Sequence, residues 1–443
     1  MGINETNSQM AAITDVLVSS SNGSKLTLEL FADIFKCIEP EVEIDTFEEQ
    51  QGSGRGDNYT ATLYRIHLAG HRKCLDDGKK QKWENNVICK RLPENPKLRD
   101  AYKSDKLFRN EVEFYTAIMP ELLKFQNTKT TELFKAMPKC YYARSDLLIM
   151  EDLRIRGFQM PDRKQGLTID ETEMVLKQVA QLHALSLAYK FENPKQFESL
   201  RKLTEEGLFS NDNINWYKEY YETLTKNAIK MLSDVLPENS KYLQAFKEFA
   251  ETTKFFQRMV SIVSEESALS AFCHGDCWAN NFLYRYETQA NGEKKVAEVC
   301  LVDFQLIRYS SIALDVANLL FCCTSKSMRD GHLEEFLNLY TIELFKWLQL
   351  LCTKIPDFCN TLEKLGNIFR LELKTYGSFA LGLALDIIPM STCSSEYAPD
   401  MYINRSNSDD GQYGAPVLNF PPNDLCRQKM SEILIDMVDN GML

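Results

Sequence analysis

The 443-residue sequence lacks an apolar run long enough to cross a membrane. Its longest apolar stretch, Phe379 to Met390, is too short to span a bilayer and contains Asp386. No apolar segment near the N-terminus resembles a signal peptide. Residues Met1 to Thr6 fit the loose pattern for N-myristoylation, but no polybasic patch accompanies them, and one acyl chain anchors a protein only marginally. We therefore expect no stable membrane anchor.

Paired cysteines and an excess of positive charge are also missing. The thirteen cysteines are scattered without any C-x-x-C pair, which is typical of reduced thiols and predicts a cytoplasmic protein. With 51 Lys and Arg against 63 Asp and Glu, the formal net charge is −12 and the pI is about 5.2. This acidic balance disfavours a nucleic-acid partner. The length and the 44% hydrophobic content fit a globular enzyme with two domains or two lobes.

The sequence does contain one dense group of polar residues. His274, Asp276 and Asn281 form the pattern H-x-D-x4-N, and an apolar run, Val299 to Val302, then leads to Asp303. An aspartate can accept the proton of an attacking hydroxyl, and an asparagine five positions later can turn back to offer its amide oxygen to Mg²⁺. A second aspartate at the end of a strand can bridge the metal to nucleotide phosphates. The spacing is that of a metal-assisted phosphoryl-transfer site.

A hairpin is expected between the two halves of this group. Residues 282–286 and 296–302 have the pattern of strands, and Asn291-Gly292 between them is a strong turn signal. Such a hairpin would bring Asn281 and Asp303 together, as a shared metal ion requires.

Two plainer interpretations stay open for the same segment. The tripeptide His274 to Asp276 alone could be an ordinary loop with a structural histidine. Cys273, His274 and Cys277 suggest a zinc site, but a fourth ligand at the usual spacing is lacking. The complete pattern, with its hairpin and second aspartate, favours phosphoryl transfer.

The N-terminal part of the chain predicts a small sheet. A glycine-rich turn, residues 51–58, lies between two strand-like stretches, and such a turn lets backbone N–H groups approach phosphates. No helix follows it, so neither a Walker loop nor a Rossmann fingerprint applies. The predicted strands cover 41–49, 59–68, 87–90, 140–142 and 147–150.

A helix from Ser104 to Met119, ended by Pro120, is expected to carry Glu111 on its inward face. Glu111 could then pair with Lys90, which ends the strand 87–90.

Beyond a basic stretch at 154–164, the pattern is mostly helical. Asp170 and Glu173 have the spacing of a capping box, and His183 is expected to be a buried packing residue. Asp315, at the start of an apolar helix, needs a partner, for which the backbone of the loop around Asp276 is the natural choice. The predicted helices are 26–38, 104–119, 213–235, 241–263, 312–320, 333–351, 365–388 and 424–438, with a polar loop over 391–422.

The order of these features resembles the eukaryotic-kinase-like superfamily. The H-G-D form resembles its small-molecule branch, with the aminoglycoside phosphotransferases and choline kinases. Closer still, the sequence resembles the ecdysteroid kinase-like family of insects over about residues 30 to 390. The segments that carry this resemblance are 56–59, 111–115, 138–141, 151–153, 182–184, 274–278 and 302–305.

The resemblance implies an α+β, two-lobed protein-kinase-like fold. A flexible N-terminus would cover 1–24, an N-lobe with a small antiparallel sheet 25–152, and a large, mainly helical C-lobe 153–443. By position, Asp276 would be the catalytic base, and Asn281 and Asp303 the Mg²⁺ ligands. The residues implied to bind ATP are Gly54, Gly56 and Asn58 in the glycine turn, Lys90, Glu111, and Glu151 and Leu153 between the lobes.

The implied activity is phosphorylation of a hydroxyl on a small apolar molecule, an ecdysteroid or a hydroxylated xenobiotic removed by detoxification. Tyr376, Phe379, Leu383 and Ile387 recur at helical spacing, and would form either plain core or the wall of an acceptor pocket.

The sequence bears on three alternatives to this function. A protein kinase would need a longer segment between Asp303 and Asp315 and an A-P-E motif after it. A choline- or aminoglycoside-type kinase remains open, although choline would need an aromatic or acidic cage that the sequence cannot place. A catalytically inactive binding protein on the same fold is disfavoured by the intact Lys90, Asp276, Asn281 and Asp303.

Overall fold

The computed structural model describes residues 17–18, 26–52, 61–74, 78–251, 254–393 and 422–443. The proposed glycine turn, with Gly54, Gly56 and Asn58, lies outside the described residues, as does nearly all of the predicted loop 391–422. Within the segment 1–24 that we expected to be flexible, Leu17–Val18 form a short strand, because a neighbouring strand offers them a parallel partner.

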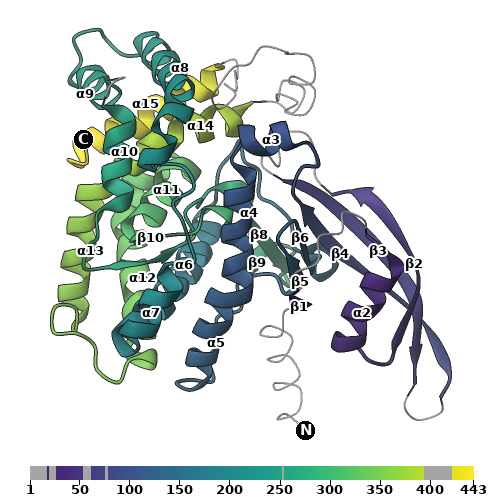
Figure 1. Cartoon of the computed structure of the whole chain (residues 1–443). Helices are drawn as coiled ribbons and strands as arrows, with labels where there is room; N and C mark the ends of the chain where they lie inside the picture. The colour runs from purple at the N-terminus through teal and green to yellow at the C-terminus, as the bar shows by residue number, and fades with distance from the viewer. Residues whose placement is uncertain (1–16, 19–25, 53–60, 75–77, 252–253, 394–421) are drawn as a thin grey trace.

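The N-lobe is built on a six-stranded sheet with the order β1-β5-β6-β4-β3-β2 (Figure 1). All its pairings are antiparallel except the one between β1 and β5. Helix α2 (Leu28–Ile38) begins at the N-cap Thr27 and buries Phe31, Ile34 and Phe35 against the sheet. The strands are β1 (Leu17–Val18), β2 (Val42–Gln51), β3 (Thr62–Lys73), β4 (Lys80–Arg91), β5 (Cys140–Arg144) and β6 (Leu147–Glu151).

Three helical segments connect β4 to β5 along the chain: α3 (Pro96–Ala101), α4 (Ser104–Glu113) and α5 (Met119–Asn127). Helix α4 runs between the sheet and the C-lobe helices in Figure 1. The prediction that Pro120 ends the helix was wrong. A π-helical turn, Phe114–Ile118, shifts the hydrogen-bond register, so that Pro120 falls in the first turn of α5. A proline is tolerated there because the missing N–H would have no intrahelical partner.

The C-lobe is mainly helical and carries two small antiparallel sheets. One pairs β7 (Ser270–Cys273) with β10 (Arg308–Ser311), and the other pairs β8 (Phe282–Thr288) with β9 (Lys294–Leu301) as the predicted hairpin. The helices are α6 (Ile169–Glu192), α7 (Pro194–Arg201), α8 (Ile214–Ser233), α9 (Lys241–Phe249), α10 (Phe255–Ser264), α11 (Ala313–Cys323), α12 (Lys326–Leu351), α13 (Leu362–Tyr376), α14 (Phe379–Thr392) and α15 (Asp424–Asp439). This architecture confirms the predicted α+β fold, with a sheet-bearing N-lobe and a large, mainly helical C-lobe.

Two long helices predicted for the C-lobe are each divided. The segment 241–263 forms α9 and α10, and the segment 365–388 forms α13 and α14 with a break at Gly377. A Cβ at Gly377 would lie 2.7 Å from the Met442 sulfur, so this glycine lets the C-terminal segment approach closely. The apolar stripe of Tyr376, Phe379, Leu383 and Ile387 therefore spans two helices, and all four side chains are buried in the core.

The capping box of α6 also differs from the prediction. The box is formed by Thr168 and Glu171, not by Asp170 and Glu173. The Thr168 hydroxyl accepts a hydrogen bond from the backbone N–H of Glu171, whose carboxylate accepts one from the N–H of Thr168. The two patterns overlap in sequence, and the helix begins where both hydrogen bonds can form.

The sequence analysis predicted unpaired cysteines and no membrane-spanning segment. All thirteen cysteines fall within the described residues, and all are free thiols. Among the helices of the described ranges, none is both long enough and apolar enough to cross a membrane.

A buried ion pair connects the C-terminal helix to the rest of the C-lobe. The Arg329 side chain, on α12, donates from Nε to Asp436 Oδ2 on α15 at 2.6 Å, and both residues are at most 5% exposed. Lys326 Nζ donates to the other carboxylate oxygen at 2.9 Å. The pair adds to the apolar contacts by which Met430, Ile433 and Leu434 attach α15 to the core.

We predict that Asp436→Ala lowers the free energy of unfolding by about 3–5 kcal/mol, because it leaves the Arg329 cation buried without its carboxylate. Glu334→Ala is the matched control, since it removes an exposed ion pair with Arg370 and should cost at most about 1 kcal/mol. Denaturant unfolding of the two variants measures both values. Equal losses would contradict a structural role for the buried pair.

Candidate functional site

A cavity of about 440 Å³ lies between the N-lobe sheet and the C-lobe. Its apolar lining includes Leu63 and Ile88 from the sheet and Leu283 from β8. Six residues that the sequence singled out also line it, which are Lys90, Glu111, Glu151, Leu153, Asn281 and Asp303. Residues as far apart in the chain as β4 and the end of β9 therefore meet at one place.

The centre of this cavity is the Lys90 ammonium, at the end of β4. Its Nζ lies 2.5 Å from Glu111 Oε2 on α4 and 2.6 Å from Asp303 Oδ1. Lys90 and Glu111 are 2% and 0% exposed, so the predicted contact between them is a buried ion pair and not a surface one. Burial disfavours the Lys90 charge, but Asp303 and Glu111 outweigh it and raise the pKa of Lys90. Burial also raises the pKa of Glu111, to about 7, in spite of Lys90.

Asp303 is held in an unusual backbone conformation. Its φ of +67° lies in the left-handed region, which a residue other than glycine rarely adopts. The conformation turns the chain at the end of β9, so that the Asp303 carboxylate points at Lys90 while Phe304 turns into the core. The Phe304 ring stacks on Phe114 of the π-helical turn at 3.8 Å between centroids. Strain at such a residue persists where the surroundings fix it, which is common at functional sites.

Asn281 and Asp276 form a second group beside Asp303. Asn281 Nδ2 donates to both the backbone oxygen and Oδ2 of Asp276, each at 2.9 Å. These bonds use the amide nitrogen and leave the amide oxygen of Asn281 for a cation. Burial, reinforced by the Asp303 carboxylate, raises the pKa of Asp276 to about 7. The arrangement offers hard oxygen atoms of the kind that Mg²⁺ prefers.

His274 connects the loop to the segment before Asp303. Its Nε2 lies 3.0 Å from the Val302 carbonyl oxygen, and its Nδ1 accepts a hydrogen bond from the Asp276 N–H at 3.3 Å. Nε2 must therefore carry the proton, and burial lowers the pKa of the ring, in keeping with a neutral imidazole. Both ring nitrogens of His274 are engaged in hydrogen bonds within the protein. His274 is therefore not available as a ligand of the zinc site considered for Cys273, His274 and Cys277.

Asp315, at the start of α11, binds the backbone of the loop around Asp276, as predicted. Its carboxylate accepts hydrogen bonds from the backbone N–H groups of His274 at 2.6 Å and Gly275 at 2.9 Å. Burial would raise the pKa of Asp315, but the hydrogen bond from His183 and the loop donors outweigh it, and the pKa is lowered. The carboxylate is therefore a stable anion whose bonds fix the loop backbone.

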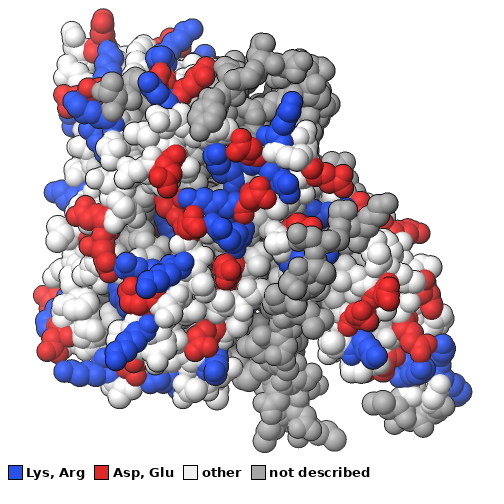
Figure 2. Space-filling view, in the orientation of Figure 1, with Lys and Arg blue, Asp and Glu red and all other residues white. Residues whose placement is uncertain are grey.

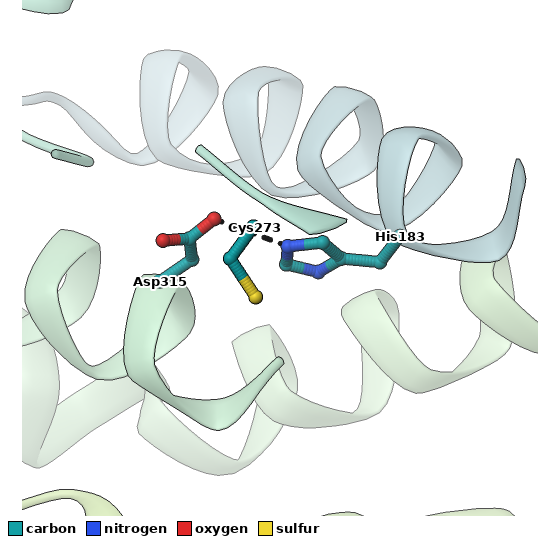
Figure 3. Close-up of side chains that lie close together, drawn as sticks. All are labelled: His183, Cys273 and Asp315. Atoms are coloured by element: carbon teal, nitrogen blue, oxygen red, sulfur yellow. Dashed lines mark hydrogen bonds and ion pairs between the residues drawn. The ribbon is translucent and has the colours of Figure 1, made fainter. Parts of the chain in front are cut away.

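His183 lies in the same network (Figure 3). Its Nε2 faces Asp315 at 3.1 Å and its Nδ1 faces the Tyr340 hydroxyl at 2.7 Å, so it is more than the packing residue that we predicted. The ligand atoms of His183, Cys273 and Asp315 all lie within 4.8 Å of one another. Because the histidine and the carboxylate are already engaged in hydrogen bonds within the protein, the group is explained as a support for the loop.

Sequence reasoning missed Asn110, the neighbour of Glu111. Its side chain donates to the backbone oxygen of Glu205 at 2.8 Å and accepts from the N–H of Glu205 at 3.1 Å. It is completely buried, and a longer hydrogen bond of 3.5 Å reaches the carbonyl of Gln305. Figure 2 shows Lys and Arg beside acidic side chains over α4, where the ion pairs include Arg109 with Glu205. Helix α4 is thus attached to the C-lobe, a long-range contact for which the sequence holds no local signal.

Arg308 is a second residue that the sequence analysis did not single out. It pairs with Cys273 in the small sheet of β7 and β10, just before the loop around Asp276, and it is 3% exposed. Its guanidinium forms an ion pair with Glu206 at 2.9 Å and lies over the Phe379 ring at 5.1 Å. Its positive charge lowers the pKa of Asp276 against the larger effect of burial. No sequence pattern marks an arginine in a strand as part of a site, so the position of Arg308 near Asp276 could be found only from the structure.

The sequence matches a known protein family. The sequence model of the ecdysteroid kinase-like family matches residues 55–353, which is more than half of the chain. No curated protein is significantly similar to the chain in sequence.

Several solved structures are similar in fold. An ethanolamine kinase of Plasmodium vivax has a TM-score of 0.39 and 12% identity, with 99% of this chain and 96% of that chain covered. A putative fructosamine-3-kinase of Thermobifida fusca has a TM-score of 0.30 and 15% identity, with 79% and 100% covered. A ternary complex of APH(2")-IIa with streptomycin and ATP has a TM-score of 0.29 and 13% identity, with 81% and 99% covered.

The loop geometry predicts that Gly275 accepts no side chain. Its φ is +85°, and a Cβ there would lie 1.9 Å from the Leu306 carbonyl oxygen. Gly292, in the β8–β9 turn, has nearly the same φ of +83° but open space around it, so Gly292→Ala isolates the cost of the backbone conformation. We expect Gly292→Ala to cost about 1 kcal/mol. Gly275→Ala should lower the unfolding temperature further and abolish activity; equal effects would contradict the close packing of the loop.

Proposed function

Because the chain belongs to the ecdysteroid kinase-like family, we propose that it is an ATP- and Mg²⁺-dependent kinase of small molecules. It would transfer the γ-phosphoryl group to a hydroxyl of an ecdysteroid or a similar apolar compound. The observation that carries this proposal is the convergence of Lys90, Asn281 and Asp303 on one cavity, with Asp276 hydrogen-bonded to Asn281. These side chains already lie close together, as the proposed phosphoryl transfer requires.

ATP would occupy the cavity between the lobes. The adenine ring would lie between apolar side chains such as Leu63, Ile88 and Leu283. Its edge would face the backbone of Glu151 and Leu153, where β6 passes into the C-lobe. Lys90, fixed by Glu111, would bind the phosphates. Gly54, Gly56 and Asn58, which follow β2 in the sequence, are proposed to cover the phosphates with backbone N–H groups.

Asn281 and Asp303 would hold Mg²⁺ through an amide oxygen and a carboxylate oxygen. When bound, the metal neutralises charge on the phosphoryl group. Asp303 lies beside Lys90, so its carboxylate would be shared between the ammonium and the metal. The left-handed backbone of Asp303 and the two hydrogen bonds from Asn281 to Asp276 hold the Asn281 and Asp303 side chains in place before ATP or metal binds. Such positioning supplies much of the catalysis in phosphoryl transfer.

Asp276 is the proposed base. Its carboxylate would accept the proton of the acceptor hydroxyl as the oxygen attacks the γ-phosphorus. Asn281 donates to Oδ2, and the Trp278 side chain also hydrogen-bonds the carboxylate, so two donors orient the proposed base. The loop itself is held by Asp315, which fixes the backbone of His274 and Gly275 and hence the position of Asp276. The free thiols of all thirteen cysteines support a reducing, cytoplasmic location.

Asp303→Asn tests the metal site. The substitution keeps the size of the side chain but removes its charge, so we expect phosphoryl transfer to fall by roughly two to three orders of magnitude, with the fold retained. Asp357→Asn, at an exposed acid, is the control and should leave activity unchanged. Thermal unfolding with ATP and Mg²⁺ gives a second readout, because ligand binding stabilises the parent protein more than the variant. Near-normal turnover in Asp303→Asn would remove this residue from the site.

A panel of acceptors tests the substrate class. The purified chain, labelled ATP and Mg²⁺ are combined with steroid alcohols, choline, an aminoglycoside and aromatic alcohols. We expect the steroid alcohols to be phosphorylated and choline to be inert, because apolar area is stabilised by burial at roughly 25 cal/mol per Å². Phosphorylation of choline or the aminoglycoside, with every steroid inert, would contradict the ecdysteroid assignment and leave the kinase assignment standing.

A further inference from the structure

One residue that lines the cavity has no role in the proposed chemistry. Asn280 lies in the short 3₁₀ turn Ala279–Asn281, directly before Asn281. Its amide nitrogen, Nδ2, is shielded from solvent and has no hydrogen-bond partner within the described part of the chain. The matching nitrogen of Asn281, by contrast, donates twice to Asp276. A buried donor without a partner costs free energy, so a bound ligand or a water molecule is expected to accept from it.

Hydrogen bonds of the backbone hold this turn in place. The Asn281 N–H donates to the Trp278 carbonyl oxygen at 2.9 Å, and the Val302 N–H donates to the carbonyl oxygen of Asn281 at 3.0 Å. The residues on both sides of Asn280 are buried, since Ala279 and Asn281 are 5% and 6% exposed. Asn280 is therefore carried by a fixed backbone at the wall of the cavity, and replacing its side chain leaves these hydrogen bonds intact.

The wall of the cavity next to Asn280 is apolar. Leu283 follows Asn281 by two positions as the chain enters β8, and both residues line the cavity, as the alternation of side chains along a strand requires. The Leu283 side chain packs against a small apolar cluster, which consists of Leu153, Phe158 and Cys300. A surface suited to a nucleotide base therefore lies two residues from the proposed metal ligand.

The proposed position of ATP places its sugar beside this segment. The adenine ring would lie on Leu283, and the phosphates would lie at the metal held by Asn281. Because the ribose joins the base to the phosphates, it would lie between these two residues, within reach of Asn280. Leu63 and Ile88 of the N-lobe sheet line the same cavity, which assigns Asn280 to the nucleotide side of the site rather than to the acceptor.

We propose that Asn280 Nδ2 donates a hydrogen bond to a ribose hydroxyl of the nucleotide. This inference rests on the proposed function and adds to it a residue that determines specificity for the sugar. A hydroxyl oxygen can accept from an amide N–H while its own hydrogen binds water. An analogue that lacks this hydroxyl leaves the Asn280 nitrogen without a partner, which lowers the affinity for the analogue. The chain therefore selects a ribonucleoside triphosphate over the corresponding deoxy form.

The test compares the binding of ATP with that of its 2′-deoxy and 3′-deoxy analogues, each with Mg²⁺, by titration calorimetry. The parent chain and Asn280→Ala are measured, and Asn360→Ala, at an exposed asparagine that contacts Asp357 and Lys364, is the matched control. We expect the parent to bind one of the two analogues roughly ten times more weakly than ATP, because one hydrogen-bond partner is lost. Asn280→Ala should bind ATP and that analogue equally weakly, and Asn360→Ala should match the parent.

Every other result overturns the inference. A parent chain that binds ATP and both analogues equally contradicts ribose recognition, and this measurement decides even if Asn280→Ala does not fold. If Asn280→Ala weakens the binding of ATP and of both analogues by the same factor, Asn280 does not act through the sugar. An unchanged affinity for ATP in Asn280→Ala excludes Asn280 from the nucleotide site. These three outcomes leave the proposed function standing, whereas a parent chain that binds no ATP would remove the proposed function and this inference together.

Discussion

A single buried ammonium group joins the two lobes. Lys90 reaches from β4 to a carboxylate on α4 and to Asp303 of the C-lobe, and it is 2% exposed. Removing one member of such a group leaves an uncompensated charge in the interior, which is far more costly than losing a surface ion pair. The relative position of the sheet, helix α4 and the segment that carries Asp303 is therefore fixed by electrostatics at the cavity.

The surroundings of this group reduce the freedom of α4. Asn110, next to Glu111, binds the backbone of Glu205 in both directions, and Phe304, next to Asp303, stacks on Phe114. Both contacts link the helix to the C-lobe on either side of the Lys90 ion pairs. In the same way Asp315 holds the loop around Asp276 through the backbone N–H groups of that loop. The groups of the candidate site are thus held by rigid elements.

How much the sequence could predict depended on whether a residue's partner was local. The β8–β9 hairpin follows from Asn291-Gly292, and the inward position of Glu111 follows from helical periodicity, so both were correct. The end of a helix at Pro120 was wrong because a π-helical turn changed the register, and a single helix over 365–388 was wrong because the C-terminal segment packs at Gly377. Asn110 and Arg308 depend on contacts between distant segments, for which a single sequence holds no pattern.

The carboxyl groups of the candidate site differ in how the protein compensates their charge. Glu111 and Asp303 both contact the Lys90 ammonium, while Asp276 receives hydrogen bonds from Asn281 and Trp278. Burial is the largest cause of the raised pKa of Glu111 and of Asp276, each about 7, and the Asp303 carboxylate raises both further. Positive charge added beside Asn281 and Asp303 would therefore lower the pKa of Asp276, because it would favour the ionised carboxylate.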